Sequence, residues 1–226
     1  MERFSYINMV NKEAYKKIHE ELRLSKITLV AVSKTKPVED ILELYNLGHR
    51  DFGENYVQEL TEKVAKLPND IRWHFIGHLQ TNKVRSIVPF IYLIHGVDSL
   101  KLLNEIDKQA EKNKRVIDCL LQVHIAQEET KFGFDENELL AVEPGQFANV
   151  KIKGLMGMAS LTENVNKIRA EFKHLKTIYD KLSTLTPQLS ILSMGMSADY
   201  KIALEEGSNM VRIGSLLFGE RNYDSK

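Results

Sequence analysis

The 226-residue chain has a single cysteine, Cys119, which excludes a disulfide framework and a cysteine-based metal cluster. It also lacks net charge, because 31 basic side chains balance 31 acidic ones, so no overall field favours nucleic acid or an anionic membrane. The most apolar run, IVPFIYLIHGV (87–97), is too short to span a bilayer. The first residues, MERFSYINMVNKEAYKK, lack the apolar core of a signal peptide. We therefore expect a cytoplasmic protein that binds neither nucleic acid nor membrane.

Short apolar runs alternate along the chain with segments of helical spacing. A helix from about Ile7 to Leu24 is expected before the first run, and Pro37 and Gly48 mark the two ends of the next one. Runs rich in Val, Ile, Leu and Phe predict buried parallel strands. There are eight of them: ITLVAVS (27–33), RDFGE (50–54), WHFIGH (73–78), YLIHGV (92–97), CLLQVHI (119–125), KGLMGM (153–158), LSILSMG (189–195) and NMVRIG (209–214).

This alternation predicts an α/β fold, a single (β/α)₈ TIM barrel with an extra N-terminal helix. No linker rich in Pro, Gly or Ser divides the chain, so residues 1–226 are expected to form one domain. An open doubly wound sheet is the structural alternative. The number of strands and the absence of G-x-G-x-x-G after the first strand disfavour it.

Polar residues follow the last two predicted strands, where a barrel of this kind carries its phosphate sites. We expect Ser197 to cap a helix that starts near Ala198 and stops before Gly207, with free amides at its start. The amides of Gly214 and Ser215 and the Ser215 hydroxyl would add further donors. Either segment alone could be an ordinary cap or turn, whereas the two together favour a bound phosphate.

A lysine ends the first predicted strand, in the segment AVSKTKP (31–37). Lys36 precedes Pro37, where the backbone leaves the strand, so only Lys34 is expected in the pocket. A lysine held near apolar walls is a competent amine nucleophile for carbonyl groups. Because the eighth strand closes onto the first, this amine and the phosphate site would be neighbours. The arrangement suits a phosphorylated aldehyde: either pyridoxal 5′-phosphate (PLP) or a phosphosugar bound by a lysine aldolase.

Six motifs resemble the pyridoxal phosphate homeostasis protein family: AVSKTKP, FGENYVQE, WHFIGHLQTNK, GLMGM, SMGMSADY and VRIGSLLFGER, spread from about Leu29 to Arg221. The resemblance implies a barrel similar to the N-terminal domain of alanine racemase, with PLP held as a Schiff base on Lys34. The other contacts it implies are Ser197, Gly214 and Ser215 at the phosphate, Asn55 near the cofactor, and Arg212 at either the ring nitrogen or the phosphate.

The resemblance also implies a role in intracellular vitamin B6 and PLP homeostasis, without established turnover and with PLP-dependent apo-enzymes as recipients. Racemisation needs an acid/base on each face of the substrate, and racemases take the second from an added β domain of another subunit. The chain ends soon after the eighth strand, and an arginine at the ring nitrogen would weaken the ring as an electron sink. We therefore expect a binding protein without catalytic residues, and a monomer, since no long exposed apolar stripe demands a partner. The alternative is a PLP-dependent enzyme acting on amino acids with weak racemase-like activity.

His74 and His78 are four residues apart, which is the spacing of a zinc-binding pair on a helix. They fall in a predicted strand and turn, however, and no third ligand is evident nearby. We expect no metal site here, and a hydrogen-bonding role for these histidines.

Overall fold

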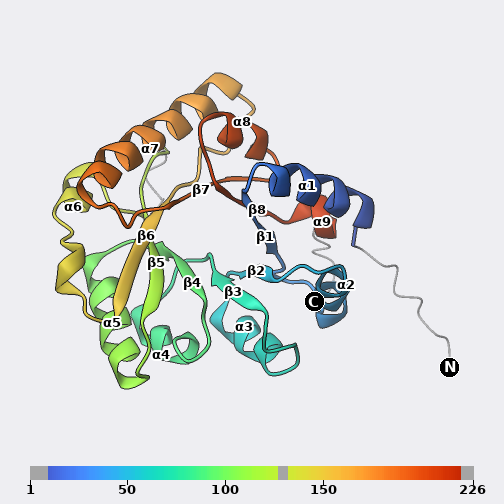
Figure 1. Ribbon diagram of the computed structural model, residues 1–226, viewed down its shortest axis with the longest axis horizontal. Coiled ribbons are helices and arrows are strands. Elements are labelled where there is room, and N and C mark those ends of the chain that lie inside the picture. Colours follow the sequence, from blue (N-terminus) through green and yellow to red (C-terminus); the bar gives the residue numbers. More distant parts are fainter. Residues whose placement is uncertain (1–9, 127–131, 220–226) are drawn as a thin grey trace.

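A computed structural model describes residues 10–126 and 132–219. In it, eight parallel strands close into a barrel, in which each strand pairs with the next along the chain and β8 pairs with β1 (Figure 1). The predicted (β/α)₈ barrel is thereby confirmed, and each predicted run overlaps one strand. The strands are β1 (Thr28–Val32), β2 (Asp51–Glu54), β3 (Arg72–Phe75), β4 (Leu93–Val97), β5 (Ile117–Gln122), β6 (Val150–Met156), β7 (Ile191–Met196) and β8 (Met210–Ile213).

Helices surround the barrel on its outside (Figure 1). In the described ranges they are α1 (Lys12–Leu24), α2 (Val38–Asn46), α3 (Val57–Val64), α4 (Val84–Ile87), α5 (Leu100–Lys112), α6 (Glu136–Leu140), α7 (Val165–Leu185), α8 (Tyr200–Glu205) and α9 (Ser215–Phe218), with 3₁₀ turns at Thr81–Lys83 and Pro144–Gln146. None of these described helices has both the length and the apolar character needed to cross a membrane.

Helix α1 begins later than the sequence predicts. Val10 and Asn11 are not helical, and the expected start at Ile7 lies outside the described residues. The reason is that Asn11 is the N-cap: its Oδ1 accepts the backbone N–H of Ala14 at 2.9 Å. This bond satisfies one of the amides that every helix start leaves without an intrahelical acceptor.

Replacing Asn11 by alanine is therefore expected to lower the free energy of unfolding by about 1 kcal/mol. Asn11→Ser is the matched control, because a serine hydroxyl can accept the same amide and should preserve most of the stability. Urea denaturation of the three proteins measures the difference. An equal loss in both variants would show that the cap bond does not carry the effect.

The barrel interior differs from the core that surrounds it. The main core lies between strands and helices, whereas a small separate apolar cluster contains Val30, Leu93, Leu120, Met156 and Met210. Along β1, alternate residues point inward. Thr28 lines a cavity at the N-terminal ends of the strands, Val30 packs in the interior cluster, and Val32 lines a cavity at the C-terminal ends. The barrel is therefore hollowed at both ends and packed between them.

Candidate functional site

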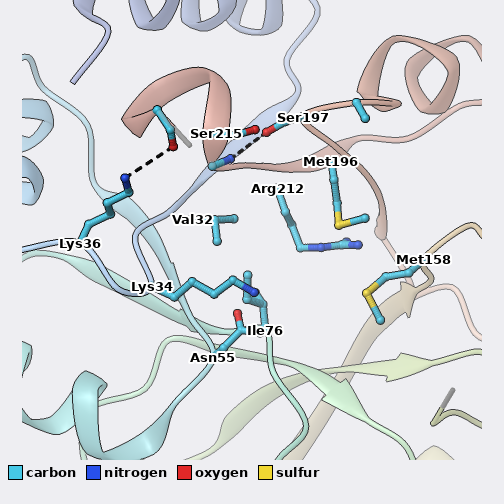
Figure 2. A pocket seen from close by; sticks show the side chains of 13 residues that line it. Val32, Lys34, Lys36, Asn55, Ile76, Met158, Met196, Ser197, Arg212 and Ser215 are labelled. Carbon is cyan, nitrogen blue, oxygen red and sulfur yellow. Dashed lines mark hydrogen bonds between the residues drawn. The ribbon is translucent and has the colours of Figure 1, made fainter. Parts of the chain in front are cut away.

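The cavity at the C-terminal ends of the strands, called here the C-terminal cavity, has a volume of about 300 Å³ (Figure 2). It brings together all six residues that the sequence singles out, and apolar side chains from several strand ends form its walls. Its lining consists of Val32, Lys34, Lys36, Asn55, Ile76, Met158, Met196, Ser197, Ala198, Arg212, Gly214, Ser215 and Gly219.

The turn after β7 is built differently from the prediction. Ser197 does not cap α8, which begins at Tyr200 with Asp199 at the N-cap position. The Asp199 carboxylate instead accepts the backbone N–H of Met196 at 2.6 Å and closes the turn. The predicted cap at Ser197 is therefore wrong. Gly195 adopts φ +95°, and a Cβ there would come within 2.6 Å of Ala203, so this glycine allows α8 to pack closely on β7.

Ser197 contacts the end of β8 instead. Its hydroxyl oxygen accepts the Gly214 backbone N–H at 3.1 Å, which leaves the hydroxyl hydrogen to donate into the cavity (Figure 2). The Gly214 amide is thus directed at Ser197. Ser215 begins the short helix α9, which the sequence did not predict. The first hydrogen bonds of this helix run from the backbone N–H groups of Leu217 and Phe218 to the Gly214 carbonyl. The backbone amides of Ser215 and Leu216 therefore have no intrahelical acceptor.

Lys34 and Lys36 both line the cavity, and the expectation that Lys36 would stay outside is wrong. β1 ends at Val32, so both lysines lie in the turn that follows. Lys36 is buried, and its Nζ donates to the Phe218 carbonyl at 2.7 Å. In Figure 2 the Lys36 amine faces this C-terminal segment, whereas the Lys34 side chain extends across the cavity toward Asn55.

Hydrogen bonds hold the turn on both sides of Lys34. The Thr35 backbone N–H donates to Glu59 Oε1 at 2.6 Å, and the Ser33 hydroxyl donates to Glu54 Oε1 at 2.6 Å. Thr35 has φ +64°, a strained conformation for a β-branched residue. Such strain persists only where the surroundings enforce it, and it concentrates at functional sites. The two carboxylates therefore fix the backbone that aims Lys34.

Lys63 on α3 joins these two carboxylates. Its Nζ donates to Glu54 Oε1 at 2.8 Å, to Glu59 Oε1 at 2.6 Å and to the Ser33 carbonyl at 2.7 Å. Glu54 is fully buried, and burial raises its pKa to about 6, although the neighbouring Lys63 acts in the opposite direction. We call Ser33, Glu54, Glu59 and Lys63 the turn clamp. It supports the lysine without lining the cavity.

Arg212 forms part of the cavity floor from β8. Its Nη1 donates to Ser193 Oγ at 2.6 Å, and its Nη2 donates to the Gly157 carbonyl at 3.1 Å. Burial lowers the pKa of Arg212 to about 10, so the guanidinium is charged at neutral pH. In Figure 2 it lies beside Met158 and Met196, away from Ser197 and Ser215.

Asn55 follows β2 and brings an acceptor to the cavity. Its Oδ1 is buried, and no hydrogen-bond donor is found for it within the described part of the chain. Buried polar atoms in native proteins rarely lack a partner. An acceptor left open on a cavity wall therefore fits a ligand that donates a hydrogen bond there.

The histidines considered for zinc do not share a site. His74 contacts His95 and Asp51 inside the barrel, whereas His78 Nδ1 lies 2.9 Å from Asp98 Oδ2 near the surface. Both therefore have the hydrogen-bonding role expected of them. Within residues 10–126 and 132–219, no group of three or more His, Cys, Asp or Glu side chains is placed to hold a metal ion.

Sequence reasoning missed the turn clamp, and it missed Ser193, which accepts a hydrogen bond from Arg212, and His95 behind it. Ser193 and His95 had a signal, because each is a polar residue within an otherwise apolar strand. No feature of the sequence pointed to Lys63, because a lysine on an amphipathic helix is ordinarily exposed.

Fold and site together define a racemase-type barrel, with a lysine after the first strand and hydroxyl groups after the seventh and eighth. In agreement, the family described as "Alanine racemase, N-terminal domain" matches residues 12–222. The chain belongs to the pyridoxal phosphate homeostasis protein family, as its motifs predicted.

Relatives of that name are similar over most of their length. The protein from Aquifex aeolicus is 45% identical over 199 residues, covering 86% of this chain and 87% of its own. The human protein is 39% identical, covering 88% of this chain and 78% of its own. Among solved structures, PipY of Synechococcus elongatus with PLP bound is 37% identical with a TM-score of 0.84, covering 92% of this chain and 99% of that one.

Proposed function

We propose that this protein binds PLP in the C-terminal cavity, with Lys34 in reversible Schiff-base linkage, and serves vitamin B6 and PLP homeostasis in the cytoplasm. The observation that carries the proposal is one cavity that combines the Lys34 amine with the hydroxyls of Ser197 and Ser215. PLP supplies an aldehyde, which condenses with a primary amine and releases water. Membership of the family and the PLP-bound structure of PipY support the same ligand.

Each remaining side chain has a proposed task. Ser197 and Ser215 donate hydroxyl hydrogens to the phosphate, and Gly214 keeps Ser197 in place through its amide. Arg212 serves the ring nitrogen rather than the phosphate, because its guanidinium points away from both serines (Figure 2). Asn55 Oδ1 accepts a hydrogen bond from the ligand.

We propose holding and delivery of the cofactor, to PLP-dependent apo-enzymes, in preference to racemase-like turnover of amino acids. Acid–base work on two faces of a substrate needs two suitably placed titratable groups. Of the described residues that line the cavity, none is Asp, Glu, His, Tyr or Cys, and Lys34 is the lysine that extends across it (Figure 2). The curated relatives reported above are likewise named for homeostasis.

The proposal is tested by the visible absorbance of the purified protein with PLP, before and after borohydride reduction. We expect a yellow protein, and a pyridoxyl mass on the peptide that contains Lys34. A colourless protein that stays unlabelled with added PLP would overturn the proposal. A labelled protein that also turns over amino acids at steady rate would overturn the holding role and favour the enzyme.

A further inference from the structure

Five polar side chains form a continuous hydrogen-bonded chain through the barrel interior. Arg212 Nη1 donates to Ser193 Oγ at 2.6 Å, and this oxygen lies 3.3 Å from His95 Nδ1. His95 Nε2 lies 2.9 Å from His74 Nδ1, and His74 Nε2 lies 3.1 Å from Asp51 Oδ1. The five residues come from five strands: β8, β7, β4, β3 and β2.

The chain of hydrogen bonds runs from one cavity of the barrel to the other. Arg212 lines the C-terminal cavity, while Asp51 and His74 line a cavity of about 360 Å³ at the N-terminal ends of the strands. Ser193 and His95 between them are fully buried. Polar residues that cross an apolar core in this way are retained only when each hydrogen bond is satisfied.

The two ends of the chain fix the direction of its hydrogen bonds. A guanidinium can only donate, and an ionised carboxylate can only accept. Burial alone would raise the pKa of Asp51, but hydrogen bonds from Arg72 and His74 hold it well below its ordinary value, so Asp51 is ionised. Ser193 Oγ accepts from Arg212, and its one hydrogen is available to donate to His95 Nδ1, its partner on the other side.

This direction assigns the tautomers of both histidines. Burial lowers the pKa of His95 well below its ordinary value, and the neighbouring Arg212 cation lowers it further, so His95 is neutral. With Nδ1 accepting from Ser193, the proton of His95 is on Nε2 and is donated to His74 Nδ1. His74 then carries its proton on Nε2 and donates it to Asp51. All four bonds point away from the C-terminal cavity.

We propose that His95 is a positioning residue for Arg212: it keeps the Ser193 oxygen turned toward the guanidinium, and His74 and Asp51 at the far end of the barrel fix its tautomer. The reverse tautomer would donate from Nδ1 to Ser193, so the serine oxygen would have to accept from two donors and its own hydrogen would lose the His95 acceptor. The group of PLP affected is the pyridine nitrogen that Arg212 serves. The inference therefore rests on the proposed function.

Two serine variants separate this role from a purely structural one. Ser193→Ala removes the acceptor of Arg212, and we expect PLP to bind roughly tenfold more weakly and with a shifted absorbance maximum, because hydrogen bonds to charged groups are the stronger ones. Ser208→Ala is the matched control, since its buried hydroxyl donates to the backbone carbonyl of Met194 at 2.8 Å, outside the chain of bonds. The control should keep the wild-type affinity and spectrum.

The pathway through His95 is tested by combining variants. His95→Phe should reproduce the spectral shift of Ser193→Ala, and the double variant should show no further change, because both act through the same contact. Additive shifts would overturn the inference. So would a Ser193→Ala protein that behaves like Ser208→Ala while the wild type binds PLP. A wild-type protein that fails to bind PLP would instead overturn the proposed function.

A measurement on the unsubstituted, cofactor-free protein avoids any loss of folding. Two-bond ¹H–¹⁵N correlation spectra distinguish the protonated nitrogen of each imidazole, with signals assigned through single histidine variants. We expect a neutral His95 with its proton on Nε2, and a proton on Nε2 of His74. An imidazolium at His95, or a proton on its Nδ1, would overturn the proposed direction of the chain whatever the result with PLP.

Discussion

The Lys34→Ala variant is expected to form no borohydride-stable adduct with PLP and to lose the visible absorbance band of the Schiff base completely. A Schiff base requires a primary amine, and alanine has none. Lys36 is not a substitute, because its Nζ is engaged by the Phe218 carbonyl and faces away from the cavity centre (Figure 2). Ser197 and Ser215 are unchanged, so weaker, non-covalent binding should persist. Absorbance titration and intact-protein mass after reduction measure both effects.

Two further variants make this result specific. Lys34→Arg retains the positive charge without a condensing amine and should also form no adduct. Lys201→Ala, which removes an exposed lysine on α8, should label as the wild type does. A reduced adduct on Lys36 in the Lys34→Ala protein, formed at the wild-type rate, would show that the two lysines are interchangeable and that the assignment to Lys34 is wrong.

The barrel could be predicted because its strands are buried on both faces. Parallel strands inside a layer of helices appear as short continuous apolar runs, and helical stripes between them complete the pattern. The ends of the helices were harder to predict from the sequence. The start of α1 depends on the side chain of Asn11, and α9 is a single turn whose sequence, SLLF, has too few residues to show a period. The extent of the single domain remains a prediction.

The cavity lining could be predicted for a similar reason: the C-terminal strand ends of a barrel converge, so residues such as Lys34, Asn55 and Arg212 meet whatever their separation in sequence. The residues that hold these side chains in place could not be predicted. Ser193 reaches Arg212 only because of the pairing of β7 with β8 and the register shift within it, and neither follows from the one-dimensional pattern. The roles of the six residues toward PLP also remain predictions.

The second large effect is expected from Lys63→Met, which removes the cation of the turn clamp. We expect the free energy of unfolding at pH 7.5 to fall by about 2 kcal/mol, because without Lys63 the buried Glu54 must either stay charged without a partner or take up a proton about 1.5 pH units above its wild-type pKa. The partner is Glu54, whose carboxylate is fully buried and accepts from Lys63 Nζ at 2.8 Å. Chemical denaturation of the variant and of Lys66→Met, an exposed lysine nearby, measures the loss.

The pH dependence identifies the carboxylate responsible for this loss. Glu54 has a folded-state pKa of about 6, above the ordinary value of 4.5. The folded protein therefore binds this proton more tightly than the unfolded chain does, which stabilises the fold below pH 4.5. This contribution is lost as the pH rises through 6. Without Lys63 its pKa rises further, so the deficit should be small at pH 5, where Glu54 is protonated in both proteins, and large at pH 7.5. Adding Glu54→Gln removes the buried charge and should recover most of the stability at pH 7.5. A deficit of equal size at both pH values would place the cost in lost packing of the lysine side chain, and the turn clamp would then hold Lys34 without electrostatic help.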